Sequence, residues 1–406
     1  MEKELWTGKK WWVSPYNFEE ETRKKFNLPK NVIFHDVTLR DGEQTPGVVL
    51  RKNEKIEIAR ALDAIGVQRI EAGMPVVSKD DRDAVYAIAH EGMKAEIYGF
   101  NRMVRTDIDE SLSCDVSGVI IEGPTGVPKL KQFNWTEDEV IGKALDTVDY
   151  AKSHGLKVAF FSVDMSRANF TFLKKLLGKV SNETKVDSFV VVDTFGCAIP
   201  EAIKYLVKMV KQVVKKPIEV HCHNDFGLGT ACALAGISAG ADVVHTSVCG
   251  IGERSGNSPF EETALSLKLL YGLDVKLNFE KLFKLSRIVE KYSGVKIPNS
   301  KSVIGKRVFT REAGIPIAGW IKYNLGSESY LPDLVGNTHG VLLGKKSGKH
   351  SIEWKLQKMG IKISENKIQT VVDEVKRKSE LIKGPISENE FKKILQKIAD
   401  PVITSQ

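Results

Sequence analysis

The stretch Ser188-Phe-Val-Val-Val-Asp193 is apolar at every position between its two polar ends. Such a run indicates a β-strand buried on both faces, as in a parallel sheet covered by helices. Seven similar short runs lie on either side of it along the chain, and segments of helix length separate them. The eight strands that we expect are 32–36, 69–71, 95–100, 118–122, 157–162, 188–193, 218–223 and 242–248.

Eight repeated βα units fit a closed barrel better than an open sheet. We therefore expect an α/β fold, with a (β/α)8 TIM barrel over residues 31–272 as the catalytic domain. Residues 1–30 form an expected N-terminal arm that is rich in aromatic residues. After the barrel the pattern changes to lysine-rich helices and a Gly/Pro-punctuated stretch, which predicts a smaller, mainly helical C-terminal subdomain over 273–406, serving as a lid or in dimerisation.

The composition of the 406-residue chain is that of a globular protein, with 42% hydrophobic and 28% charged residues. No apolar run is long enough to cross a bilayer, and no signal peptide is evident, so we expect no membrane role. The five cysteines lack CxxC spacing, which favours reduced thiols and a cytoplasmic location. The net charge of +8 is spread out rather than clustered, which argues against nucleic acid but would attract a polyanion such as coenzyme A.

Polar side chains recur where the expected strands end, and in a barrel these ends share one mouth. His221 and His223 lie at positions i and i+2 of one strand, so both side chains point to the same face. Such a pair is either a metal clamp or a buried, hydrogen-bonded pair of histidines. Asp41, after the first strand, and Asn257, after the eighth, could add oxygen ligands. This donor set suits an open site for Mg, Mn, Co or Zn.

Arg40 precedes the candidate ligand Asp41 and carries a planar guanidinium. Such a group can hold a carboxylate or stabilise a developing oxyanion. The alternative is a salt bridge to Glu43 or Glu71.

Four ordered segments resemble the motifs of the DRE-TIM metallolyase superfamily, in particular those of its Claisen-condensing branch. That branch includes 2-isopropylmalate, homocitrate, citramalate and Re-type citrate synthases. Two segments after the barrel, Tyr330-Leu-Pro-Asp-Leu-Val-Gly336 and Leu343-Gly-Lys-Lys-Ser-Gly348, resemble the subdomain that follows the barrel in these synthases. The four motif segments are His35-Asp-Val-Thr-Leu-Arg-Asp-Gly-Glu-Gln-Thr-Pro-Gly47, Val192-Asp-Thr-Phe-Gly196, His221-Cys-His-Asn-Asp225 and Gly250-Ile-Gly-Glu-Arg-Ser-Gly-Asn257.

The resemblance implies a metal-dependent acyltransferase of carboxylic acid or amino-acid biosynthesis. Such an enzyme condenses acetyl-CoA or a related acyl-CoA with a 2-oxo acid and then hydrolyses the thioester. Its expected partners are these two small molecules and a second copy of the chain in a homodimer. The residues implied at the metal are Asp41, His221, His223 and Asn257, and those implied at the substrate are Arg40, Gln44, Glu71 and Thr194.

Three departures from the family pattern concern the base and the substrate. The family's Gly-Ile-His segment, whose histidine is implicated in removing the acyl-CoA α-proton, ends here in Pro316. The family's Ser-x-x-His loop after the fourth strand corresponds here to residues 122–128, which contain no histidine and end in Pro128. The family's Glu-Asp pair after the fifth strand is replaced here by Val163-Asp164. Arg40 is then the charge-stabilising catalytic residue, and the open candidates for the base are Glu253, His339 and Tyr330.

Two other functions remain open. The same metal and arginine would serve a 3-hydroxyacyl-CoA lyase, which runs the condensation in reverse. The missing base favours that alternative, and the synthase-like C-terminal segments argue against it. A non-catalytic or nucleic-acid-binding barrel is a more distant alternative, and the set of metal-binding residues argues against it.

Overall fold

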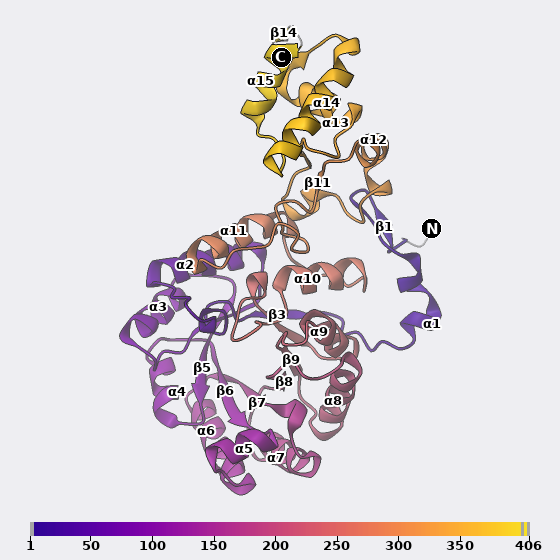
Figure 1. The fold of residues 1–406 in the computed structure, drawn as a ribbon. Coiled ribbons are helices and arrows are strands. Elements are labelled where there is room, and N and C mark those ends of the chain that lie inside the picture. Colours follow the sequence, from indigo (N-terminus) through magenta and orange to yellow (C-terminus); the bar gives the residue numbers. More distant parts are fainter. Residues whose placement is uncertain (1–3, 399–401, 404–406) are drawn as a thin grey trace. The chain divides into compact units, whose positions relative to one another are not determined.

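The computed structural model describes residues 4–398 and 402–403. Packing within the chain defines two compact units. The larger unit comprises residues 14–297, and the smaller one combines residues 4–13 with the described residues from Pro298 onward. Figure 1 shows the elements of both units.

The larger unit is a closed barrel of eight parallel strands that follow one another in chain order (Figure 1). The last strand, β10, pairs with the first, β3, and so closes the barrel. All eight predicted strands are confirmed, with small differences at their ends. The strands are β3 (Ile33–Asp36), β4 (Arg69–Gly73), β5 (Glu96–Arg102), β6 (Gly118–Pro124), β7 (Lys157–Val163), β8 (Ser188–Asp193), β9 (Ile218–Cys222) and β10 (Val243–Thr246).

Helices surround the barrel and cover the outer faces of the strands. Their buried stripes are apolar, as in α7, where Phe172, Leu176 and Val180 face inward at helical spacing. The helices are α1 (Glu20–Arg23), α2 (Lys52–Ile65), α3 (Lys79–Ala89), α4 (Arg105–Leu112), α5 (Val127–Phe133), α6 (Glu137–Ser153), α7 (Phe170–Glu183), α8 (Pro200–Val213), α9 (Gly229–Ser238), α10 (Phe260–Leu269) and α11 (Leu282–Ser293).

The interior of the barrel is apolar on one side and polar on the other. Strands β5 to β8 contribute an apolar cluster that includes Phe100, Phe161 and Val192. Strands β3, β4, β9 and β10 instead contribute imidazole and carboxylate groups that are at most 1% exposed. These residues are His35, Glu71, Glu219, His221 and His245.

The smaller unit is mainly helical and has its own apolar core, which contains Trp320, Ile352, Val371 and Phe391. Three two-stranded sheets accompany its helices. The elements are β1 (Thr7–Gly8), β2 (Trp11–Trp12), β11 (Thr310–Arg311), α12 (Gly314–Lys322), β12 (Gly340–Val341), α13 (Lys349–Met359), β13 (Ile361–Lys362), α14 (Glu365–Ile382), α15 (Glu388–Ile398) and β14 (Val402–Ile403).

This division of the chain differs from the expected boundaries at residues 30/31 and 272/273. Part of the aromatic arm belongs to the smaller unit, because Trp12 N donates to Ser329 O at 2.9 Å and β1 pairs with β2 as a hairpin. Residues 273–297 belong to the larger unit, because α11 packs on α2.

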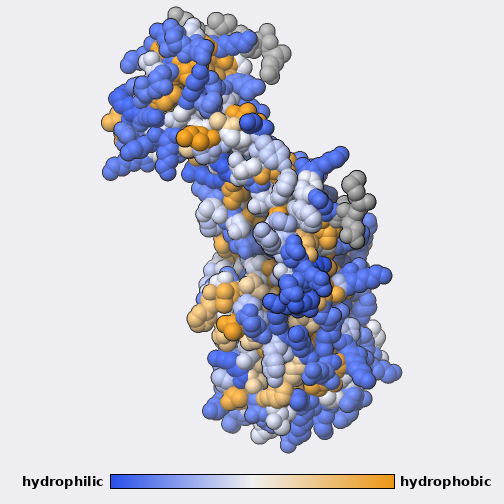
Figure 2. Space-filling view, turned by 90° about the vertical axis from the view of Figure 1, so that its right-hand side faces the viewer, coloured by the Kyte–Doolittle hydropathy of each residue, from blue (hydrophilic) through white to orange (hydrophobic). Residues whose placement is uncertain are grey.

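No described helix combines the length and the apolar character that a membrane span requires. On the face drawn in Figure 2, hydrophilic residues predominate and hydrophobic residues occur in small groups.

Candidate active site

Two imidazoles and a carboxylate meet at the carboxyl ends of β9 and β3. His221 Nε2 and His223 Nε2 lie 3.2 Å apart, and each lies 3.7 Å from Asp41 Oδ2. Asn257 Nδ2 donates to Asp41 Oδ1 at 2.9 Å, which leaves the buried Asn257 Oδ1 without a partner among the described residues. The structure therefore brings together all four side chains that were expected at the metal.

The protonation of the two imidazoles suits metal binding. Burial holds the pKa of His221 well below its usual range, and the neighbouring His223 adds to this effect. Burial also lowers the pKa of His223. Its Nδ1 lies 3.1 Å from the Gly256 carbonyl, which places the proton there and leaves a lone pair on Nε2. Neutral imidazoles directed at one point beside a carboxylate fit a divalent cation.

Arg40 lies beside the two histidines and Asp41, and its guanidinium makes several hydrogen bonds. Its Nε donates to Glu71 Oε1, and its Nη1 donates to Asp41 Oδ2 at 3.1 Å and to Gln44 Oε1 at 3.2 Å. The guanidinium stacks on the Phe100 ring, with Cζ 3.8 Å from the ring centroid. Arg40 Nη2 is buried and has no partner among the described residues. The expected salt bridge to Glu71 thus exists, and the guanidinium still has an N–H group for a ligand.

Thr194 and Glu253 also lie at the barrel mouth. Thr194 Oγ1 accepts a hydrogen bond from the Asp164 backbone at 2.8 Å, so its own O–H remains able to donate. The backbone N–H of Glu253 donates to Asp41 Oδ1 at 3.3 Å. The Glu253 side chain is 55% exposed and pairs with Arg254 at 3.2 Å. The other expected alternative for Arg40, Glu43, instead pairs with Lys55.

The remaining base candidates belong to the smaller unit. His339 Nε2 lies 2.7 Å from Glu328 Oε2 and 3.1 Å from Trp320 Nε1. Pro316, at the position of the missing family histidine, lies in α12, and the Phe309 ring packs edge-on against Tyr330. A histidine paired with a carboxylate is a common form of general base, but the assignment of the base stays a prediction.

A group of cations that no sequence pattern predicted lies around one aromatic ring. The ring is Phe195, which directly follows Thr194 beyond the end of β8. Arg167 Cζ, Arg254 Cζ and Lys129 Nζ lie 4.2, 5.0 and 5.6 Å from its centroid. Each of the two arginines is paired with an aspartate, whereas Lys129 has no carboxylate within 4.0 Å among residues 4–398 and 402–403.

Lys129 also acts on a carboxyl group at the mouth. Burial raises the pKa of Glu122, on β6, while the positive charges of Arg40 and Lys129 oppose this rise. Lys129 is partly buried as a residue, and its positive charge acts on Glu122 of β6. Lys129 lies in a short helix, α5, that follows a loop. The sequence there has no periodic pattern that could have identified this lysine.

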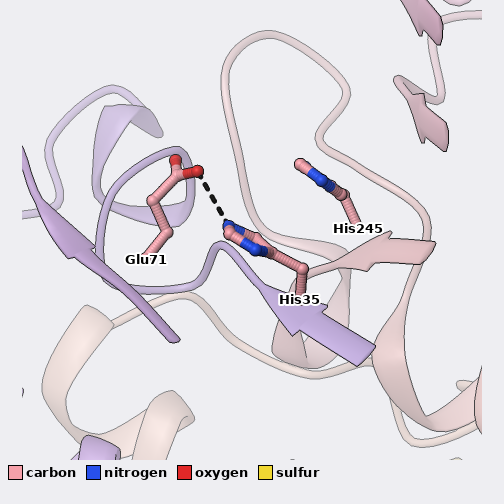
Figure 3. A group of neighbouring side chains, drawn as sticks. All are labelled: His35, Glu71 and His245. Atoms are coloured by element: carbon pink, nitrogen blue, oxygen red, sulfur yellow. Dashed lines mark hydrogen bonds and ion pairs between the residues drawn. The ribbon is translucent and has the colours of Figure 1, made fainter. Parts of the chain in front are cut away.

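A second buried group lies inside the barrel (Figure 3). It contains Glu71, which was expected at the substrate, and two histidines that were not predicted, His35 and His245. His35 Nε2 lies 3.0 Å from Glu71 Oε2, and the His35 and His245 rings stack with centroids 4.3 Å apart and planes inclined by 13°. The three residues could be taken for a metal site. Against this, Glu71 is already paired with Arg40, and His245 Nε2 bonds to Glu219 at 2.7 Å. A buried hydrogen-bond network therefore explains the group better.

Cys197 lies just beyond the Phe195 ring and is exposed. Its backbone N–H donates to Asp193 Oδ1 at 3.2 Å, and its Sγ lies 3.7 Å from Ser166 Oγ. Partial burial of the sulfur raises the pKa of the thiol.

The sequence matches two family models that together span most of the chain. Residues 31–289 match the HMGL-like family, and residues 303–383 match the homocitrate synthase post-HMGL domain-like family. The chain belongs to the HMGL-like family. Its barrel and its smaller unit correspond to these two matches in that order.

Relatives in this family are similar to the chain over nearly its whole length. Homocitrate synthase AksA of Methanothermobacter thermautotrophicus is 39% identical over 97% of the chain and 99% of its own length. The (R)-citramalate synthase CimA of Methanocaldococcus jannaschii is 41% identical over 91% of the chain and 75% of its own length. The 2-isopropylmalate synthase of the same organism is 39% identical over 89% of the chain and 70% of its own length.

Among solved structures, the HMG-CoA lyase of Bacillus subtilis has a TM-score of 0.60 and 19% sequence identity, and covers 67% of this chain and 96% of its own. At that identity the likeness shows the barrel fold alone. The synthase relatives are about twice as similar in sequence and also match the part of the chain after the barrel. The HMGL-like chain is thus a Claisen-condensing 2-oxo acid acyltransferase of the homocitrate, citramalate and isopropylmalate synthase family.

Proposed function

We propose that this acyltransferase requires a divalent metal and condenses acetyl-CoA or a related acyl-CoA with a 2-oxo acid, and that hydrolysis of the thioester follows. The observation that carries the proposal is the meeting of two neutral imidazoles and Asp41 beside a buried arginine with a free donor. The product would be a 2-hydroxy-2-alkyl dicarboxylic or tricarboxylic acid.

The residues of the site have distinct tasks in this reaction. Asp41, His221 and His223, with Asn257 as a further ligand, would hold a divalent ion whose Lewis acidity polarises the keto group. Arg40 Nη2 donates to the oxygen of that group and stabilises the negative charge that forms on it when the acyl-CoA enolate attacks the carbon.

Other side chains would bind and orient the substrates. The Thr194 hydroxyl donates to the carboxylate next to the keto group, and Gln44, hydrogen-bonded to Arg40, lines the same pocket. The proton that leaves the acyl-CoA methyl group passes to a base, for which Glu253, His339 and Tyr330 remain the predicted candidates.

The reaction is tested by a thiol-release assay. Acetyl-CoA is incubated with pyruvate, 2-oxoisovalerate, 2-oxoglutarate, oxaloacetate or glyoxylate in the presence of Mg or Mn. We expect free coenzyme A to appear with one of these acids, to disappear when a chelator is added and to return with added metal. Silence across the panel, together with cleavage of a 3-hydroxyacyl-CoA, would instead establish the lyase reaction.

We further infer that the acceptor carries a second carboxylate, which Lys129 binds. Lys129 is partly buried, and its Nζ lies 5.6 Å from the Phe195 ring centroid and has no carboxylate within 4.0 Å among the described residues. Val163 is apolar, and the charge of Asp164 is neutralised by its ion pair with Arg167. Lys129 is therefore available to bind an anion on this side of the mouth.

The Lys129→Met variant is expected to raise the KM for a dicarboxylic 2-oxo acid about tenfold or more, because one charge-assisted hydrogen bond is lost. The KM for acetyl-CoA should not change. Lys131→Met is the matched control, since Lys131 lies on the same helix, α5, and is exposed. A rise in the KM for acetyl-CoA instead would mean that Lys129 binds the phosphates of coenzyme A.

A further inference from the structure

One side of the barrel interior contains a polar network where branched apolar side chains usually pack. His35 on β3, Glu71 on β4, Glu219 on β9 and His245 on β10 are all buried. Closing the barrel puts His245 directly beside His35, because β10 and β3 are paired in that register. The network is therefore a product of the barrel closure itself.

The network links two arginines through two carboxylates and two stacked rings. At one end Arg40 donates to Glu71, whose other oxygen lies 3.0 Å from His35 Nε2. At the other end His245 Nε2 lies 2.7 Å from Glu219 Oε2, and Arg69 Nη1 lies 2.8 Å from Glu219 Oε1. The stacking contact between the His35 and His245 rings connects the two ends of the network.

The protonation states of His35 and Glu71 decide which of the two donates the hydrogen bond between them. Burial lowers the pKa of His35 to about 4, so its ring is neutral near pH 7 and carries one proton. Burial would raise the pKa of Glu71, but the charge of Arg40 and the hydrogen bond from His35 lower it to about 2. The single proton of His35 is thus donated from Nε2 to an ionised Glu71, while Arg40 occupies the other Glu71 oxygen.

We propose that His35 is a positioning residue for Arg40, acting through Glu71, and that the stacked ring of His245 holds His35 in place. The proposal rests on the proposed role of Arg40 in the condensation. Glu71 has two oxygens, and fixing one of them by His35 fixes the direction in which the other receives Arg40. The interior of the barrel then fixes the direction of Arg40 Nη2, which has no partner among the described residues.

Stability alone does not account for the network. Replacing His35 with phenylalanine leaves Glu71 paired with Arg40, and replacing His245 leaves Glu219 paired with Arg69 and Ser188. In both variants each buried carboxylate keeps an arginine partner, so neither change strands a buried charge.

The test compares three variants in the thiol-release assay with the metal-loaded protein. His35→Phe is expected to lower kcat at least about tenfold, with the KM for the 2-oxo acid and the metal affinity nearly unchanged and with a melting temperature close to that of His245→Phe, which likewise removes one donor from a buried carboxylate. His35→Gln, which keeps an N–H donor, should recover most of the lost kcat. His245→Phe is the matched control, since it preserves the stack and should lower kcat only slightly.

An unchanged kcat in His35→Phe would overturn the proposal, as would a failure of His35→Gln to restore it. A fall of kcat in step with metal affinity and melting temperature would also overturn it, because that result indicates a structural role. Failure of the proposed function would look different, because the unmodified protein would then release no thiol with any 2-oxo acid.

Discussion

The Arg40→Ala variant is expected to bind metal and fold, yet to turn over about a hundred times more slowly than the unmodified protein. The reason is that Arg40 Nη2, beside the proposed metal ligands, is buried and has no partner among the described residues. Removing a preorganised donor to a developing oxyanion costs on the order of 3 kcal/mol in the barrier. Steady-state kinetics of thiol release, with metal content measured on the same samples, checks this expectation.

The Arg40→Lys variant tests whether the positive charge of Arg40 is sufficient or whether the planar shape of its guanidinium is also needed. Lysine keeps the positive charge but cannot bind Glu71, Asp41 and a substrate oxygen at the same time through a planar fork. We expect its turnover to remain well below normal. Near-normal turnover by the alanine variant would remove Arg40 from the mechanism.

The second large effect is expected from His221→Ala. This substitution removes one of two imidazoles whose Nε2 atoms lie 3.2 Å apart, so metal affinity should fall by at least about a hundredfold and activity with it. Titration calorimetry with Mn measures the affinity directly. His90→Ala is the control, because His90 is an exposed histidine on the outside of the barrel, at the end of α3.

Excess metal should partly restore the His221→Ala activity if the loss is one of affinity. An unchanged affinity for Mn would show that the two histidines are a structural pair, which is the alternative that the sequence left open.

Sequence reasoning predicted the barrel well because the signal is local. A run such as Ser188–Asp193 is buried on both faces whatever its neighbours are, and eight such runs define the strand order. The group of His221, His223 and Asp41 at the mouth was also predictable. The i, i+2 spacing of His221 and His223 places them on one face, and strand ends must meet at the mouth.

The interior network could not be predicted in the same way. Glu219 lies two residues before His221 and so shares its face, which was a usable signal. The stack of His35 on His245 depends on the pairing of the first strand with the last, and no local pattern encodes that pairing. The position of Lys129 depends in turn on a seven-residue helix and the loop before it.

The exposed thiol of Cys197 has a practical consequence for enzymology. Aromatic disulfides that reveal free coenzyme A react with any accessible thiolate, so the protein itself will consume reagent and give a slow rise in absorbance. Because the pKa of this thiol is raised, the background should grow steeply above neutral pH. Quenching samples before adding the dye, or using a Cys197→Ser protein, would keep that background from being mistaken for turnover.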